Sequence, residues 1–446
     1  MTSTNGTTWK FPKEFWFANF MELCERAAYY GFFIVLTLYL TDIVGFTDKE
    51  TGVVAGVFFA LLYFLPPFVG AISDKIGFRN GLILAFSLLT VGYFLLGVWH
   101  SKALVIFFLV IVLIGGSFIK PLITATVAKT TNEVNRARGY SLFYWIVNIG
   151  SFSGKTFVPY IRQGVGLEYV NFFSSAMSLV ALLFAIFMFK NFDKKRETKS
   201  IAEVFAALKR IFSTPRLIIL ILIVTGFWII QHQLYATMPK YVIRLIGPEA
   251  KPEWLANVNP LVVVMFVVLI TQLMRKFKAV TSMLIGMILM PFSAFAMSLS
   301  QTGQISSGEF VSVFGLFNMY SLTLMMIIGI GIQGLAECFI SPRFLEYFSL
   351  QAPKGEEGLY LGFSHLHSFF SALAGFIMSG YLLDAYCPDP STLPAGLTEV
   401  QRAAYYSDAH VIWYYFIAIG FVAAVALFIY KIVVDRIDAK KEAQNA

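Results

Sequence analysis

Three charged residues lie within one helical turn of an apolar segment near the N-terminus. Glu22, Glu25 and Arg26 occur in the run ELCERAAYYG. Each charge costs about 2.5–3.5 kcal/mol on insertion scales if it stays at the centre of a membrane. Glu22 and Arg26 are four residues apart and can pair, which leaves Glu25 as a carboxylate that can take up or release a proton. The pattern indicates a proton site that faces water, and a structural ion pair is the alternative.

Other polar residues also interrupt apolar segments. Lys155 comes seven residues after Asn148 and shares its helix face, where it either points inward or snorkels to the outer surface. His365 and His367 are two residues apart and face different directions, and no further ligand is spaced to complete a metal site. The three cysteines have no paired spacing, which excludes a disulfide scaffold and a zinc site. We expect no metal, no cofactor and, without a nucleophile or phosphate loop, no enzyme.

The composition indicates what surrounds these residues. Of 446 residues, 58% are hydrophobic and 13% are charged, whereas a soluble domain carries about 25% charged residues. A water-soluble chain cannot hide so much apolar surface in one core, but a bilayer can accept it. We therefore expect an integral protein of the cell membrane, inner or plasma. The distribution of the basic residues, described next, argues against a nucleic-acid partner.

Twelve apolar runs are long enough to cross the hydrocarbon core, which needs about 20 residues. They lie near 15–40, 50–73, 81–99, 103–128, 139–161, 170–189, 217–243, 260–274, 279–300, 314–342, 358–383 and 409–432. Cytoplasmic loops carry an excess of Lys and Arg. With the N-terminus inside, 24 of the 34 basic residues fall on the cytoplasmic side and 7 on the outside. Both termini are therefore predicted to be cytoplasmic.

A polar break divides the spans into six and six. We predict an N-terminal six-helix bundle at 1–189, a cytoplasmic amphipathic linker at 190–216 and a C-terminal six-helix bundle with a cytoplasmic tail at 217–446. Apolar residues recur in the linker at helical spacing: Ile201, Val204, Phe205, Leu208 and Phe212. This spacing favours a helix on the membrane surface, although a solvated connector explains it nearly as well.

Two halves of six helices joined by a basic loop are the architecture of major facilitator transporters. Residues 70–79, GAISDKIGFR, resemble the loop signature of that superfamily, in which Gly77 allows a tight turn and Asp74 can cap a helix end. The implied fold class is an all-α membrane protein of the major facilitator fold. It has 12 transmembrane helices in two six-helix bundles, with the binding site between the bundles near mid-membrane.

Further motifs resemble one family, the proton-dependent oligopeptide transporters. The ELCER run followed by Tyr-Tyr-Gly looks like the family's helix 1 signature. The other matches are Tyr63, GGSFIKP at 115–121, FY at 143–144, NIGSF at 148–152, NPL at 259–261, ECFISP at 337–342 and APK at 352–354. They span most of the chain in the right order. The linker is too short for the two additional helices that bacterial members often carry.

The resemblance implies a role for each matching residue. Glu22, Glu25 and Arg26 would form the proton-coupling cluster. Lys120 would pair with one of these glutamates and receive the substrate carboxylate, and Glu337 would receive the substrate amine. The peptide backbone would hydrogen-bond to Tyr29, Tyr30, Tyr63, Asn148 and Asn259, while Arg26 and Lys120 hold the carboxylate end.

Three departures put peptide specificity in question. Phe33 replaces the basic residue that the family has seven positions after Arg26. The family's helix 7 glutamate is missing from FWIIQHQ at 227–233, where Gln231 and His232 stand at or beside its place. GFSH at 362–365 lacks the helix 11 tryptophan. We expect His232 to take part in proton coupling, and Lys155 to join the substrate-binding residues in place of the lost cation.

These observations predict a proton-coupled symporter that imports small polar solutes, foremost di- and tripeptides, by alternating access. The alternative is a proton-coupled transporter of a small anion, nitrate or an organic acid, that uses His232 and Lys120. A non-transporting receptor on the same scaffold would have lost the coupling residues, which are present. The expected partners are a small-molecule substrate, protons and the lipid bilayer, and we expect a monomer.

Overall fold

The computed structural model describes residues 9–132, 135–190, 200–301, 309–313, 315–353 and 357–445. The chain forms two compact units. Unit 1 consists of residues 1–39 and 61–206, and unit 2 consists of residues 40–60 and 207–446. Most described residues are helical, and the described strands form a two-stranded antiparallel hairpin in unit 2, with β1 at Phe310–Val313 and β2 at Phe317–Tyr320.

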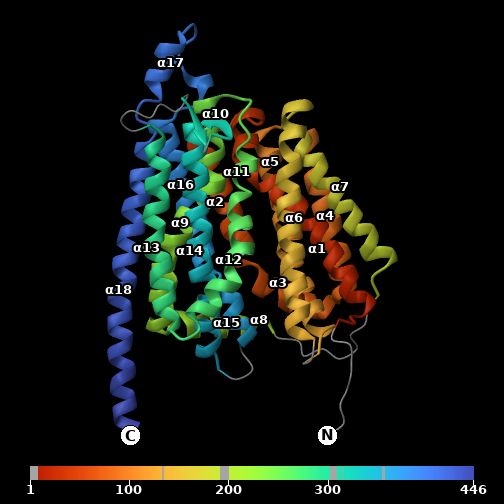
Figure 1. Cartoon of the computed structure of the whole chain (residues 1–446). Coiled ribbons are helices and arrows are strands. Elements are labelled where there is room, and N and C mark those ends of the chain that lie inside the picture. Colours follow the sequence, from red (N-terminus) through yellow and green to blue (C-terminus); the bar gives the residue numbers. More distant parts are fainter. Residues whose placement is uncertain are drawn as a thin grey trace. The chain divides into compact units, whose positions relative to one another are not determined.

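Unit 1 is a bundle of long helices (Figure 1). These are α1 (Lys13–Leu38), α3 (Pro66–Ile76), α4 (Phe78–Val98), α5 (Lys102–Lys129), α6 (Arg136–Gly164) and α7 (Tyr169–Phe187). Helix α1 packs against α6 and α7, and α4 packs against α5 and α7. Gly77, between α3 and α4, has a φ of 104°, the left-handed region that suits glycine in a tight turn. The side chain of Asp74 lies outside the described residues.

Unit 2 is a second helical bundle. Its helices are α9 (Pro215–Ala236), α10 (Met238–Ile246), α11 (Pro252–Leu255), α12 (Val258–Met274), α13 (Ala279–Ser298), α14 (Ser321–Gln351), α15 (Glu357–Ser364), α16 (Leu366–Tyr386), α17 (Glu399–Tyr405) and α18 (Val411–Asn445). Helix α13 packs between α14 and α18, α9 packs on α16, and α12 packs on α14. Within this unit α10 and α17 lie at one end and α15 at the other (Figure 1).

Three elements run from one unit into the other along the chain. The π-helix Tyr39–Ile43 continues α1, and α2 (Asp48–Phe64) begins in unit 2 and ends in unit 1. Helix α8 (Ile201–Phe212) occupies the C-terminal part of the predicted linker. It buries Val204 and Ile211, whereas Phe205 of the predicted apolar stripe is 56% exposed. Its place on the membrane surface and the domain bounds 1–189, 190–216 and 217–446 stay predictions, and residues 191–199 lie outside the described part.

The number of membrane helices follows from length and composition. Ten helices in the described part of the chain are long and apolar enough to cross a membrane, and α2 with α3 is an eleventh if this pair is one span. The pair bends by 47°, because Pro66 and Pro67 have no N–H to donate to the preceding turn. Helix α6 corresponds to the remaining predicted span. It is 29 residues long but carries Lys155 and several arginines, and it is not among the ten.

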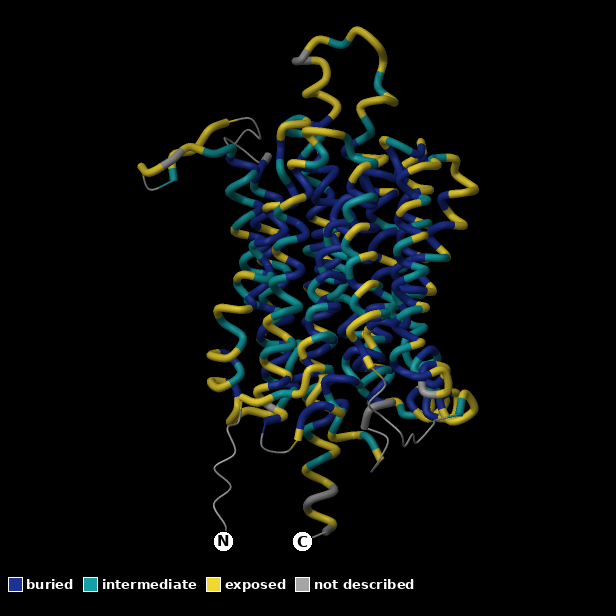
Figure 2. The backbone as a smooth tube through the Cα atoms, turned by 90° about the vertical axis from the view of Figure 1, so that its right-hand side faces the viewer, coloured by how far each residue is buried: buried dark blue, intermediate teal, exposed yellow. Residues whose placement is uncertain are grey.

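Large apolar side chains are exposed on many of these helices. Phe107 on α5 is 59% exposed, Val268 on α12 is 64% exposed and Phe428 on α18 is 53% exposed. Figure 2 shows exposed positions recurring along helices as well as in the loops. Soluble proteins rarely expose apolar patches of this extent, so these faces are suited to lipid.

Candidate functional site

Close packing of α6 on α1 positions the charged residues of unit 1. A Cβ atom at Gly150 would lie 2.7 Å from the carbonyl oxygen of Leu23, and one at Gly154 would lie 2.4 Å from that of Ala27. Only glycine permits this approach of two helix backbones. The glycine of the NIGSF motif therefore has a packing reason that the sequence alone does not reveal: it seats α6 directly against the turn that carries Arg26.

The charges on α1 form one compact cluster. The Nε of Arg26 donates to Oε2 of Glu25 at 2.5 Å and lies 3.3 Å from Oε1 of Glu22. Both glutamates are 3% exposed. The sequence suggested that Arg26 pairs with Glu22 and leaves Glu25 over. In the structure the guanidinium holds Glu25 more closely, and Oε2 of Glu22 is buried with no hydrogen-bond partner among the described residues.

A second cation and three tyrosines border this cluster. Lys120 on α5 lies close enough to act electrostatically on both Glu22 and Arg26. The Arg26 guanidinium lies 4.9 Å from the centre of the Tyr29 ring and 6.0 Å from that of Tyr30, which is cation–π geometry. Tyr63 interacts with Tyr29. The predicted residues of α1, α2 and α5 are thus neighbours within unit 1.

Lys155 is fully buried, with 0% of the residue exposed. It therefore does not snorkel to the surface in this structure. Its Nζ lies 5.4 Å from the centre of the Tyr30 ring, so Tyr30 has cations on two helices beside it. Phe33 is 3% exposed and its ring lies 5.3 Å from that of Tyr29. Asn148 is half-buried and donates Nδ2 to the carbonyl of Tyr144 in its own helix at 2.8 Å.

Two predicted residues of unit 2, Asn259 and Glu337, lie in contact. Oε2 of Glu337 accepts a hydrogen bond from Nε2 of Gln231 at 3.0 Å and another from Nδ2 of Asn259 at 3.3 Å. Three helices, α14, α9 and α12, each supply one of these side chains. Gln231 is the residue that the sequence noted beside the missing glutamate without giving it a role. The arrangement holds a carboxylate by two neutral amides.

His232 lies on a different face of α9. It is 4% exposed, and its ring centre is 6.3 Å from that of Trp228 and 5.9 Å from that of Phe376. Consecutive helix residues point about 100° apart, so Gln231 reaches Glu337 while His232 packs toward α16. His367 stacks on Trp228 with ring centres 5.2 Å apart. Histidine and tryptophan here form an aromatic layer between α9 and α16.

Sequence reasoning missed a buried ion cluster at one end of unit 2. Asp48 is 4% exposed and lies 2.6 Å from Nζ of Lys240 and 2.7 Å from Nη1 of Arg244. Arg244 also donates to the carbonyl of Cys387 at 2.6 Å and lies 3.3 Å from Asp389. Burial lowers the pKa of Lys240 to about 8, and Asp48 opposes that shift. From the sequence, Lys240 and Arg244 are both assigned to outer loops. The one available sign of a buried partner is Asp48 at the start of an apolar helix.

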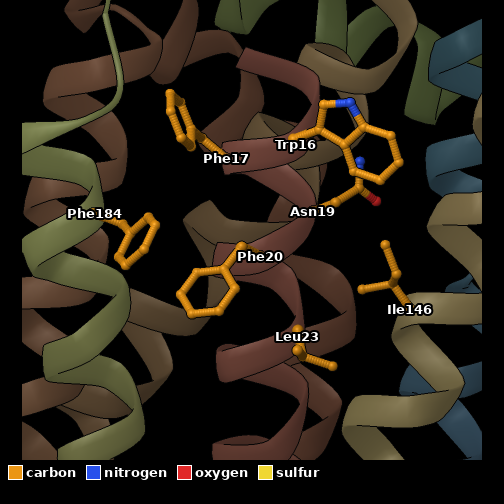
Figure 3. Close-up of a pocket in the computed structure, with 7 residues that line it drawn as sticks. All are labelled: Trp16, Phe17, Asn19, Phe20, Leu23, Ile146 and Phe184. Atoms are coloured by element: carbon orange, nitrogen blue, oxygen red, sulfur yellow. The ribbon is translucent and has the colours of Figure 1, made fainter. Parts of the chain in front are cut away.

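An apolar groove in unit 1 lies apart from these charges. Its volume is about 360 Å³, and it is lined by Trp16, Phe17, Asn19, Phe20, Leu23, Ile146 and Phe184. Figure 3 shows Phe184 of α7 on one side of α1 and Ile146 of α6 on the other. The rings of Phe20 and Phe184 have centres 4.3 Å apart. Such a lining has no charged group for a polar solute, so the groove is not part of the candidate site.

Membrane-length helices with buried carboxylates and cations define an integral membrane protein of the transporter class. The chain belongs to the Major Facilitator Superfamily, whose family model matches residues 17–318. The predicted all-α major facilitator fold and the membrane location are therefore confirmed.

Individual relatives agree with this membership. The "Dipeptide and tripeptide permease B" of Aliivibrio fischeri (strain MJ11) is 25% identical over 434 residues, which cover 83% of this chain and 85% of the relative. The "Multidrug resistance protein MdtH" of Blochmanniella pennsylvanica (strain BPEN) is 21% identical over 358 residues, which cover 79% of this chain and 82% of the relative. The first of these relatives is a permease by name.

Solved structures give the same fold. One that is described as addressing substrate recognition in proton dependent oligopeptide transporters matches with a TM-score of 0.72 at 18% identity, covering 95% of this chain and 98% of the other. The resemblance to proton-dependent oligopeptide transporters that the motifs indicated is thus confirmed in fold and in the names of similar proteins.

Proposed function

We propose that this chain is a proton-coupled symporter that imports di- and tripeptides by alternating access, rather than an enzyme. The observation that carries the proposal is the charge balance in unit 1. Glu22 and Glu25 contribute two negative charges, and Arg26 and Lys120 contribute two positive charges, within one mutually interacting group. We propose one chain as the transport unit, because all of these residues come from a single chain.

Charge balance couples substrate to protons. A substrate carboxylate that binds at Lys120 leaves this group with one negative charge in excess. An unbalanced buried charge is costly, and protonation of a glutamate removes it. Substrate and proton therefore favour each other's binding, as linkage requires. Glu22 is the carboxylate with a buried, unpartnered oxygen and is the first candidate to take up the proton.

Unit 2, taken by itself, has a carboxylate that suits the amino group of a peptide. Glu337 is held by Gln231 and Asn259, which donate to its carboxylate without neutralising its charge. An ammonium group would be attracted to this carboxylate, whereas a small anion such as nitrate would be repelled by it. Similarity to a named dipeptide and tripeptide permease supports the same choice. We assign backbone contacts of the peptide to Tyr29, Tyr30, Tyr63, Asn148 and Asn259, and a supporting positive charge to Lys155.

The test is uptake into proteoliposomes under an imposed pH gradient, with a dipeptide, its N-acetylated form and nitrate as competitors. The proposal expects accumulation of the dipeptide and weak competition by the other two. Glu22→Gln should abolish gradient-driven uptake but retain counterflow exchange, because a permanently neutral side chain cannot exchange a proton. Equal loss of both activities would indicate misfolding. Competition by nitrate with none by any dipeptide would favour the anion transporter instead.

A further inference from the structure

Gln231 has a polar atom that the contacts described so far do not use. The residue is 5% exposed, and its Nε2 donates to Oε2 of Glu337 at 3.0 Å. Its Oε1 is buried and has no hydrogen-bond partner among the described residues. Buried side-chain acceptors usually have a hydrogen-bond donor, so this oxygen is a candidate to accept a hydrogen bond from a ligand.

Chemistry fixes which end of this amide faces Glu337. An ionised carboxylate only accepts hydrogen bonds, so the amide must present its NH₂ group to it and its oxygen elsewhere. Asn259 donates to the same carboxylate oxygen at 3.3 Å, which further commits Oε2 to accepting. The oxygen of Gln231 is therefore an acceptor held next to a negative charge, a setting that favours a cationic donor.

We propose that Gln231 determines specificity for the amino end of the substrate: its Nε2 holds Glu337, and its Oε1 accepts a hydrogen bond from the substrate ammonium. The inference rests on the proposed peptide function. An ammonium group has three N–H donors, which can serve the Glu337 carboxylate and the Gln231 oxygen together. An acetylated amine has one N–H and no charge, so it cannot satisfy both. Glu337 and Gln231 together would thus recognise only a free amine.

The chain offers a matched control for this residue. Gln333 on α14 is also a fully buried glutamine, with 0% exposed, and its Oε1 also has no partner among the described residues. Its Nε2 lies 3.5 Å from the carbonyl oxygen of Ile230. Gln333→Leu therefore removes a buried amide of the same kind without removing the donor that holds Glu337.

The experiment measures competition by a dipeptide and by its N-acetylated form in purified wild type, Gln231→Leu and Gln333→Leu, each with its thermal unfolding midpoint. Loss of a hydrogen bond to a charged group should reduce the preference for the free amine about tenfold to hundredfold in Gln231→Leu. Gln333→Leu should keep the wild-type preference. Retention of the preference in Gln231→Leu, or equal loss in both variants, would overturn the inference.

Gln231→Glu gives a second readout that a structural role would not move. Two adjacent carboxylates cannot both ionise readily and share a proton. An arriving ammonium would displace that proton, so each dipeptide that binds to the variant should release one proton more than in wild type. The logarithm of dipeptide affinity should therefore rise more steeply with pH in the variant, by about one unit per pH unit. An unchanged pH slope would count against contact between the ammonium and position 231. If wild type shows no preference for a free amine, the proposed peptide function is wrong. If wild type shows this preference and Gln231→Leu retains it, only the role of Gln231 is wrong.

Discussion

Asp48→Asn would show how strongly the buried ion cluster stabilises unit 2. The carboxylate lies 2.6 Å from Lys240 and 2.7 Å from Arg244, and its side chain is 2% exposed. Removing one partner of a buried ion pair leaves an uncompensated charge, which costs about 3–5 kcal/mol. Here one carboxylate serves two cations, so we expect a loss of stability in the upper part of that range.

A matched control lies one residue along the chain. Lys49 is 2.7 Å from Asp384, but the side chains of this pair are 47% and 45% exposed. Exposed pairs contribute about 0.2–1 kcal/mol. Asp384→Asn makes the same chemical change at a similar distance and differs mainly in burial. The two variants together separate the effect of burial from the effect of losing a charge.

The assay can use the protein's own cysteines. Cys24, Cys338 and Cys387 are all buried, so a thiol-reactive fluorophore labels them as the chain unfolds in detergent. Asp48→Asn should lower the apparent unfolding midpoint by several degrees, and Asp384→Asn should leave it nearly unchanged. Adding Lys240→Met to Asp48→Asn should restore part of the loss, because it removes one uncompensated cation. Equal midpoints for the two single variants would refute the reasoning.

Three further outcomes are expected. The pKa of Lys240 in the folded chain is about 8, below its ordinary value of 10.5. Between these pH values the unfolded chain binds more protons than the folded chain, so the unfolding midpoint should rise from pH 8 toward pH 10. Lys240→Met should lack this rise. Lys155→Ala should weaken dipeptide binding about tenfold by calorimetry through loss of a charge-assisted contact, and Phe33→Arg should restore part of it; unaltered affinity would limit Lys155 to packing beside Tyr30. His232→Gln should flatten the pH dependence of uptake, because we propose that His232 takes part in proton coupling; an unaltered profile would make His232 a packing residue of the layer between α9 and α16.

Features that depend on neighbouring residues of one helix could be predicted from the sequence. The spacing of Glu22, Glu25 and Arg26 places them on one turn, and the structure brings them together. Long apolar runs likewise predicted the helices, since a membrane span needs only length and composition. Spacing could not decide how Arg26 divides itself between two carboxylates. That choice depends on side-chain conformation beside α6, which packs on α1 through Gly150.

Features that depend on different helices could not be read in the same way. Gln231 and Glu337 are 106 positions apart, and Asp48 and Lys240 are 192 apart. In the sequence, Lys240 counts as one more basic residue on the outer side, although the fold buries it completely against a carboxylate. Gln231 is a second residue whose contact could not be predicted from the sequence. A missing glutamate suggests a lost function, but the neutral amide of Gln231 beside its place holds Glu337 and leaves an oxygen that we propose for the substrate. Substitution within a family motif therefore has to be interpreted through the partner that the fold supplies, and here that partner is the carboxylate on α14.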